Sequence, residues 1–206
     1  MAAQRTYRGV PAEERRAGRR RQLLEAALDV WGGTDDAHVT MTGICQAAEL
    51  TERYFYESFP NLDHALVAVV DHVADEVQRA TITALADAGP DTLDRVTAVV
   101  AAFVHTMVDD PRRGRAALIE AQGIAATRPR RDVILRRVAR LAAREARKVG
   151  GPAAWSEDDG PLLATLFVGG VAQLTATALE PDGPVPDEVV AAARRTFRAM
   201  TTTSSV

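Results

Sequence analysis

The side chains best suited to contact a polyanion lie in one short run, the segment TERYFYESF. It combines a hydroxyl group, a guanidinium and two phenol rings within a few residues. Such groups hydrogen-bond to phosphates and to base edges. More hydroxyl and imidazole groups flank the run on both sides. The candidate contact residues in and around it are Thr40, Thr42, Thr51, Arg53, Tyr54, Tyr56 and His64.

Signatures of catalysis or metal binding are missing from the sequence. It has no phosphate-binding glycine loop, no GxSxG motif and no cluster of cysteines and histidines. His72 and Glu76 have helical i, i+4 spacing, but one such pair makes a poor metal site. The single cysteine, Cys45, is expected to be a small core residue rather than a redox sensor. We therefore predict that the protein is not an enzyme and needs no metal and no cofactor.

The contact residues belong to a recognisable arrangement of elements. Residues 39–66 are expected to form a short helix, a tight turn at Glu49-Leu50, a second short helix and the start of a third. Thr51 is expected to cap the second helix, and Pro60 to end it. This is the layout of a helix-turn-helix, which sets one helix into the major groove of DNA. Phe55 and Phe59 are expected to face the core.

Charge is distributed unevenly, although the net charge is only −3. Residues 1–24 hold seven arginines against two glutamates, a net of +5, directly before the helix-turn-helix. Phosphate neutralisation is needed there, and Arg19 and Arg20 are candidates for it; a solvated tail is the alternative. Residues 112–148 hold twelve bases and three acids, and residues 61–111 hold two bases and nine acids. The central basic stretch is more simply a solvated face beside the acidic one than a second nucleic-acid surface.

The rest of the chain also has helical periodicity, and no segment shows a convincing strand pattern. We expect an all-α fold of about nine helices, with a helix-turn-helix domain at 12–60 and a larger helical domain at 61–201. Residues 1–11 and 202–206 are expected to be disordered. The N-terminal segment lacks the apolar stretch of a signal peptide, and no uninterrupted apolar run reaches the length of a membrane span. A cytoplasmic protein without membrane contact is the default expectation.

Many residues of the first 70 follow a known pattern at fixed offsets. In the first helix they are Arg20-Arg21-Gln22-Leu23-Leu24-Glu25-Ala26-Ala27-Leu28 and Trp31. In the helix-turn-helix they are Thr40, Ile44, Ala48, Leu50, Thr51, Phe55, Tyr56, Phe59 and Leu66. Over residues 15–70 the chain resembles the N-terminal domain of the TetR family of transcriptional repressors. The resemblance implies that Thr51 and Tyr56 contact phosphates and that Arg53 and Tyr54 contact base edges.

Other interpretations of these residues remain open. Tyr54 and Tyr56 could be packing residues with their hydroxyls in water, and His64 could be a plain surface histidine. The chain also departs from the family pattern. Glu49 replaces the usual turn glycine, Arg53 stands where a glycine is common, and Leu62 stands where many members have a phosphate-binding lysine. Together with the acidic Glu52 and Glu57, these departures predict that phosphate binding relies more on the arginines of residues 1–24 and on Thr40, Thr42, Thr51 and Tyr56.

The remaining 140 or so residues exceed what DNA binding needs. The resemblance implies that they bind a small-molecule effector and form a homodimer. The apolar helix at about 157–179, with the helix at 186–201, is the candidate for a four-helix dimer interface; a central helix of a monomeric core is the alternative. The effector is expected between the helices at 61–88, 92–108, 112–127 and 157–179. Candidate pocket residues, which could equally be plain core, are Phe103, Met107, Leu118, Gln122, Trp155 and Phe167.

The resemblance thus implies a ligand-responsive repressor. It would bind a palindromic operator on double-stranded DNA as a dimer and leave it when the effector binds. The alternative is a helical small-molecule-binding protein with weakened or lost DNA binding, which the acidic second helix of the helix-turn-helix makes conceivable.

Overall fold

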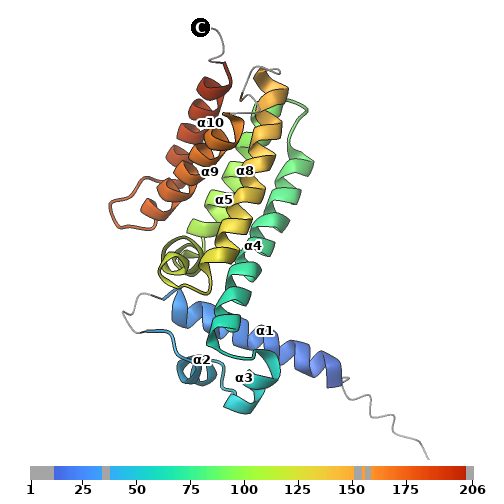
Figure 1. Ribbon diagram of the computed structural model, residues 1–206, viewed down its shortest axis with the longest axis vertical. Helices are drawn as coiled ribbons and strands as arrows, with labels where there is room; N and C mark the ends of the chain where they lie inside the picture. Colours follow the sequence, from blue (N-terminus) through green and yellow to red (C-terminus); the bar gives the residue numbers. More distant parts are fainter. Residues whose placement is uncertain (1–11, 34–37, 151–154, 156–158, 203–206) are drawn as a thin grey trace, which may run out of the picture.

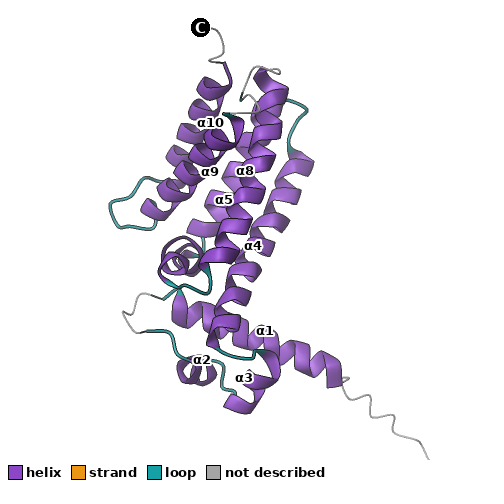
Figure 2. Cartoon of the chain, in the orientation of Figure 1, coloured by secondary structure: helices purple, strands orange, loops and turns teal. Residues whose placement is uncertain are grey.

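The chain folds as a helical molecule in which a small N-terminal group of helices sits at one end of a longer bundle (Figure 1). The computed structural model describes residues 12–33, 38–150, 155 and 159–202. Within these ranges every regular element is a helix (Figure 2), so the predicted all-α fold is confirmed. Residues 1–11 and 203–206, predicted to be disordered, lie outside the described ranges. Thr202, also predicted to be disordered, is instead the last residue of a helix.

The described helices follow the chain in a simple order. At the N-terminal end are α1 (Ala12–Trp31), α2 (Met41–Ala47) and α3 (Glu52–Ser58). The body contains α4 (Leu62–Asp87), α5 (Thr92–Val108), α6 (Pro111–Gly114), the π-helix η1 (Arg115–Glu120), α7 (Ala121–Gly123), α8 (Arg128–Gly150), α9 (Gly160–Thr177) and α10 (Pro186–Thr202). Counting the continuous stretch 111–123 as one element gives the nine helices that were predicted, for the described part of the chain.

Side-chain caps fix where several helices begin. Each of four N-cap residues uses a side-chain oxygen to accept a hydrogen bond from a backbone N–H in the first turn. These caps are Thr40, Asn61, Asp91 and Asp110. Such a bond stabilises a helix by about 1 kcal/mol. Thr51 also occupies an N-cap position, but its side chain makes no capping bond, so only its predicted place is right.

Two predicted helices have different limits in the structure. The helix expected at 112–127 is broken into α6, η1 and α7 and ends at Gly123. The widened η1 turn contacts α1, α4 and α9, so packing on several sides replaces the regular α-helix there. The helix expected at 157–179 is described as α9, Gly160–Thr177, with Asp159 at its N-cap. Residues 157 and 158 of that prediction lie outside the described ranges.

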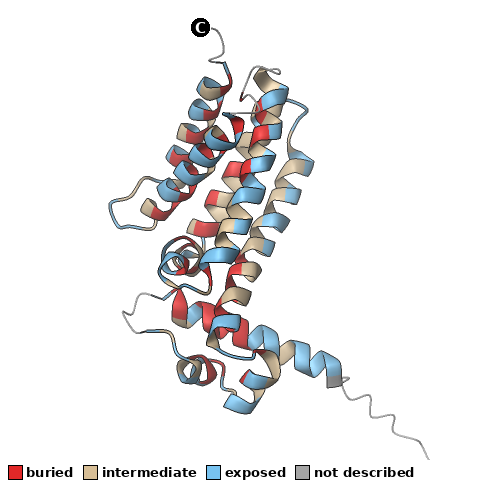
Figure 3. Ribbon diagram, in the orientation of Figure 1, coloured by how far each residue is buried: buried red, intermediate tan, exposed pale blue. Residues whose placement is uncertain are grey.

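Two hydrophobic clusters form the interior (Figure 3). The first joins α1, α2 and α3 to the N-terminal half of α4 and to η1 and α7, with Leu23, Phe55 and Leu66 fully buried. The second lies among α5, α8, α9 and α10, around Trp155 and Phe197. α4 extends from the first cluster along the body (Figure 1). The first cluster continues across residue 60, so the helix-turn-helix and the body share a core.

α9 is the most apolar helix of the described chain. Its 18 residues have a mean hydropathy of 1.3, which is enough by length and composition alone to cross a membrane. Core helices of soluble proteins meet the same criterion, and 44% of this helix is buried. Its neighbours in the bundle are α8 and α10. α9 is therefore accounted for as a bundle helix.

Candidate nucleic-acid interface

The turn between α2 and α3 sets the direction of α3. After α2, Ala48 is the C-cap and Glu49 follows in the left-handed conformation, with φ of 52°. The N–H of Leu50 donates to the carbonyl of Cys45 at 3.0 Å, and that of Glu49 donates to Gln46 at 3.1 Å. This pair of bonds is the Schellman motif, which usually has glycine at the left-handed position. Glu49 therefore accepts the strain that its place in the sequence suggested.

The prediction that Phe55 and Phe59 face the core is confirmed. Phe55 and Phe59 are buried, and their ring centroids lie 5.6 Å apart. Ile44 of α2 is buried in the same cluster. Cys45 is buried too, and desolvation raises the pKa of its thiol, in agreement with a small core residue. The apolar side of α3 is thereby fixed, which leaves its other side free to face outward.

The outward side of α3 carries most of the predicted contact groups. The side chain of Arg53 is 84% exposed, and Tyr56 is 58% exposed. The Tyr56 ring stands edge-on to Phe55, with centroids 5.9 Å apart. One edge of the ring therefore packs against the core, while the side chain as a whole stays exposed. Thr51 is exposed at the N-terminal end of the helix. Tyr54 is only half-buried and lies against α1.

The flanking polar groups lie at helix starts. The Thr40 hydroxyl accepts from the N–H of Gly43 at 3.0 Å; a hydroxyl in this position can still donate its own hydrogen to a phosphate. Thr42 is exposed one residue into α2. His64 is exposed in the first turn of α4, with its Nδ1 2.8 Å from the side-chain oxygen of Asn61. If Nδ1 carries the hydrogen in that bond, Nε2 remains available to an external partner.

Arginines of α1 pack against the aromatic residues of α3. The guanidinium of Arg19 lies 4.4 Å from the centre of the Tyr54 ring, and that of Arg20 lies 4.7 Å from Phe59. Cation–π contacts at partly exposed sites contribute about 0.5–1 kcal/mol each. Arg19 and Arg20 were predicted to neutralise phosphates. The structure brings both of them beside α3.

The sequence analysis did not predict that Arg16 and Glu57 contact the residues around α3. Arg16 donates to the backbone carbonyl of Glu57 at 2.9 Å, although the residues are 41 positions apart. The carboxylate of Glu57 receives a hydrogen bond from Nε of Arg53 at 3.1 Å and lies 3.5 Å from Arg19. The i, i+4 spacing of Arg53 and Glu57 could have indicated their pairing. The spacing of Arg16 and Arg19 on one face of α1 was a weaker signal.

The α1–α3 group contacts the body near the C-terminal end of α1. Arg112 of α6 forms ion pairs with Asp29 of α1 and with Asp110, the latter at 2.6 Å. The hydrogen bonds with Arg112 lower the pKa of the Asp110 carboxyl, and the same bonds raise the pKa of the Arg112 guanidinium. Next to this group, a Cβ added to Gly32 would lie 2.2 Å from the carbonyl oxygen of Arg112. The backbones of α1 and α6 are therefore in direct contact.

The six predicted effector residues do not gather around one described cavity. Met107 and Leu118 are buried in the first cluster, and Gln122 is exposed. Trp155 and Phe167 belong to the second cluster, where Trp155 donates to the carbonyl of Met200 at 3.1 Å. Only Phe103, which is partly exposed, packs against both clusters.

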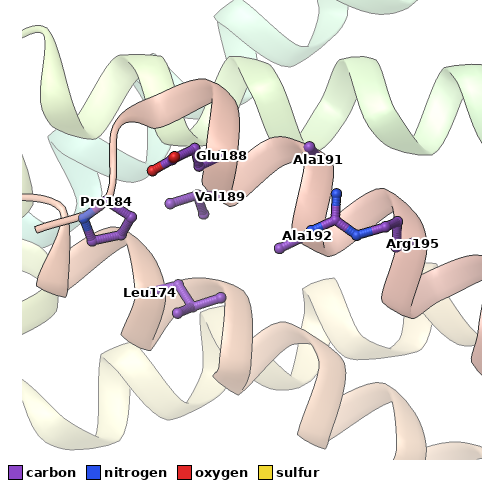
Figure 4. Close-up of a pocket in the computed structure, with 7 residues that line it drawn as sticks. All are labelled: Leu174, Pro184, Glu188, Val189, Ala191, Ala192 and Arg195. Atoms are coloured by element: carbon purple, nitrogen blue, oxygen red, sulfur yellow. The ribbon is translucent and has the colours of Figure 1, made fainter.

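The described pockets are surface grooves beside α9. One lies between α9 and α10 and contains Leu174, Val189 and Arg195 (Figure 4). The other lies between α8 and α9 and contains Arg136, Thr165 and Gly169. Neither groove is lined by any of the six predicted effector residues.

Comparisons with solved structures match this architecture over nearly the whole chain. A TetR-like transcriptional regulator from Rhodococcus sp. RHA1 superposes with a TM-score of 0.70 over 95% of this chain and 100% of its own, at 17% identity. The regulatory protein TetR from Rhodobacter sphaeroides gives 0.67 over 87% of this chain and 97% of its own, at 21% identity. A TetR-family transcriptional regulator from Bordetella parapertussis 12822 gives 0.67 over 86% and 93%, at 17% identity.

The similarity lies in structure rather than in sequence. No protein-family model and no curated protein matches the chain. The structural matches nevertheless include both the short N-terminal helices and the body, since they span most of both chains. The chain therefore has the fold of these TetR-like transcriptional regulators.

Proposed function

We propose that this protein is a dimeric, ligand-responsive regulator of transcription that represses by binding operator DNA through α3. The observation that carries the proposal is the division of α3 into a buried aromatic side and an exposed polar side. Phe55 anchors the helix in the core, while Arg53 and Tyr56 project outward. A helix that enters a major groove needs this combination of a fixed back and a polar front. The TetR-like fold supports the same assignment.

Each exposed group has a role in this proposal. Thr51 and Tyr56 donate to phosphates on either side of the groove. Arg53, and Tyr54 where it turns away from α1, contact base edges; a bidentate arginine–guanine contact contributes about 1–3 kcal/mol of discrimination. Thr40, Thr42, His64 and Arg20 complete the phosphate contacts on the operator, together with Arg19 where it leaves Glu57.

The dimer is proposed to form through α9 and α10. The outer face of α9 exposes Leu162 and Leu166 to 67% and 69%. On the same helix an added Cβ at Gly169 or Gly170 would meet nothing within 4 Å, so another helix has room to approach closely. The groove between α9 and α10 contains Leu174 of the same helix, which is 40% exposed (Figure 4). Two copies packed here would form a four-helix bundle and bury these leucines.

Release from DNA is proposed to start at an effector site in the body. Phe103 is the best single candidate, since it packs against both hydrophobic clusters. α4 begins beside the helix-turn-helix and runs into the body, and α6 contacts α1. A ligand that prefers a splayed arrangement of these helices would weaken operator binding in proportion to its differential affinity. A screen for compounds that raise the melting temperature tests the site: a hit should lose its effect in Phe103→Ala if the proposal holds.

The DNA-binding part is tested by titrating a fluorescent duplex selected from a randomised pool by the wild-type protein. Tyr56→Ala should weaken binding about tenfold, because it removes a phosphate contact and the ring that supports it. Ile82→Ala is the matched control, since Ile82 is equally exposed but lies on α4. Equal affinity of Tyr56→Ala and the control would argue against contact through α3.

The second candidate is a helical ligand-binding protein without DNA binding. Glu52 and Glu57 favour it, because carboxylates on α3 repel phosphates. Selection from the randomised pool discriminates: enrichment of a sequence motif excludes this alternative, and a pool that never enriches supports it.

A further inference from the structure

One carboxylate lies at the centre of the proposed DNA-binding surface. One oxygen of Glu57 accepts from Nε of Arg53 at 3.1 Å, and the other lies 3.5 Å from Arg19. The side chains of Glu57 and Arg19 are 34% and 26% exposed, so their pair is partly shielded from water, whereas Arg53 is 84% exposed. Its backbone carbonyl also accepts from Arg16. Three arginines from two helices therefore converge on this residue.

The atoms used in the Arg53 pair decide what that arginine can still do. Glu57 engages Nε, so the two terminal nitrogens of Arg53 project from the far side of the guanidinium. Two parallel N–H groups match the O6 and N7 acceptors of guanine. A carboxylate behind the arginine fixes the plane of the guanidinium and repels a phosphate that approaches the same place. Glu57 thus favours a base-edge contact of Arg53 over a phosphate contact.

Glu52 carries the same charge as Glu57 but takes no part in these ion pairs. It lies on the same helix, in the first turn, and is exposed. The described ion pairs of α3 involve Glu57 and not Glu52. Removing either carboxylate changes the charge of α3 by one unit, but only the loss of Glu57 releases two arginines.

We propose that Glu57 is a positioning residue that sets sequence discrimination, holding Arg53 for guanine and withholding Arg53 and Arg19 from phosphates of other DNA. This inference rests on the proposed DNA-binding function. It adds that each half of the target site contains a guanine contacted by Arg53. Discrimination is the ratio of affinity for the target to affinity for unrelated DNA, and Glu57 raises it chiefly by keeping the second affinity low.

The test compares Glu57→Gln with Glu52→Gln on two duplexes of equal length and composition. One duplex is selected from a randomised pool by the wild-type protein, and the other is a scrambled version of it. Glu57→Gln should tighten binding to the scrambled duplex about tenfold and steepen its salt dependence by about 1–2 units of log K against log salt, one for each arginine freed. Binding to the selected duplex should change less than about threefold. Glu52→Gln should shift both duplexes equally.

A second variant separates this role from a structural one. In the background Arg53→Gln, the further change Glu57→Gln should lower discrimination less than it does in the wild-type protein, because only Arg19 is then left to be freed. Arg53→Lys keeps the charge but loses the planar fork, so discrimination should fall with an unchanged salt dependence. The Arg53→Lys readout does not depend on the stability of Glu57→Gln.

The outcomes distinguish the inference from the function beneath it. Equal ratios for Glu57→Gln and Glu52→Gln, in a wild-type protein that does discriminate, overturn the role of Glu57 and leave DNA binding intact. If Glu57→Gln lowers discrimination as much in the Arg53→Gln background as in the wild-type protein, the role of Glu57 is also overturned. A wild-type protein that binds neither duplex removes the proposed function and this inference together.

Discussion

Glu49 shows how a single residue departs from the TetR pattern that the sequence resembles. Its left-handed backbone closes the turn before α3, a conformation that costs a residue with a Cβ about 1–2 kcal/mol. The sequence indicated the place of this strain, because the Glu stands where a glycine is usual. The caps at Thr40 and Asn61 could also be predicted from the sequence, since the capping residue and its helix are adjacent in the chain. The contacts of Glu57 with Arg16 and Arg19 were not, because they join helices distant in sequence.

Replacing Glu49 by Gly should stabilise the protein by about 0.5–1 kcal/mol. The relief of left-handed strain exceeds the entropy that glycine adds to the unfolded chain. The free energy of unfolding in urea measures the change. Glu49→Ala is the control, since it removes the carboxylate but keeps the Cβ; a gain as large in this variant would contradict the backbone explanation.

Asp110 makes stability depend on pH. Its pKa is lowered in the folded protein, chiefly by the hydrogen bonds with Arg112, so its contribution is present above the pKa of the unfolded chain and is lost as pH falls through the folded pKa. Asp110→Asn should therefore cost about 1–2 kcal/mol at pH 7 and flatten the loss of stability below about pH 4. Urea unfolding between pH 3 and 7 measures both effects. The neighbouring Asp109→Asn, at an exposed position, should leave the profile close to that of wild type.

At the scale of elements, the contact between α1 and α6 fixes how the helix-turn-helix is held.

The limits of α1, α4 and α5 were predictable to within a residue or so, because glycine, proline and capping residues mark them. The break of 111–123 into α6, η1 and α7 was not. It results from packing against α1, α4 and α9, which local sequence does not encode.

Gly32→Ala should destabilise the protein by about 1–3 kcal/mol, because its Cβ would overlap the carbonyl of Arg112 and force α1 from α6. Gly18→Ala is the matched control within α1. Nothing lies within 4 Å of a Cβ there, so the helix should gain about 0.5–1 kcal/mol. The two variants should change the melting temperature in opposite directions. If both lower it by a similar amount, the helix α1 itself, rather than its contact with α6, is sensitive to substitution of glycine.

For the whole molecule, the proposed dimer relates two copies of α3. The sequence located the apolar helix α9, but its buried pattern cannot by itself separate a core from an interface. The structure adds that Leu162 and Leu166 are left exposed on the outer face. The effector site was the hardest part to predict, since aromatic and methionine residues in a helical body pack as core whether or not a ligand binds.

Leu166→Glu should weaken dimerisation at least about 100-fold, because the symmetry of the interface would bury two new charges. Sedimentation velocity across a range of protein concentrations measures the dissociation constant. Ile82→Glu introduces the same charge at a similarly exposed position on α4 and should not change it. A monomeric wild-type protein would contradict the interface.

Hydroxyl-radical footprinting on a selected duplex tests the central claim most directly, namely that two outward-facing α3 helices enter one DNA duplex together. We predict two protected patches centred about 34–36 Å apart along the axis, related by a dyad, and both requiring about tenfold more protein in Tyr56→Ala. A single patch, or two patches that appear at the same protein concentration in Tyr56→Ala, would contradict the account.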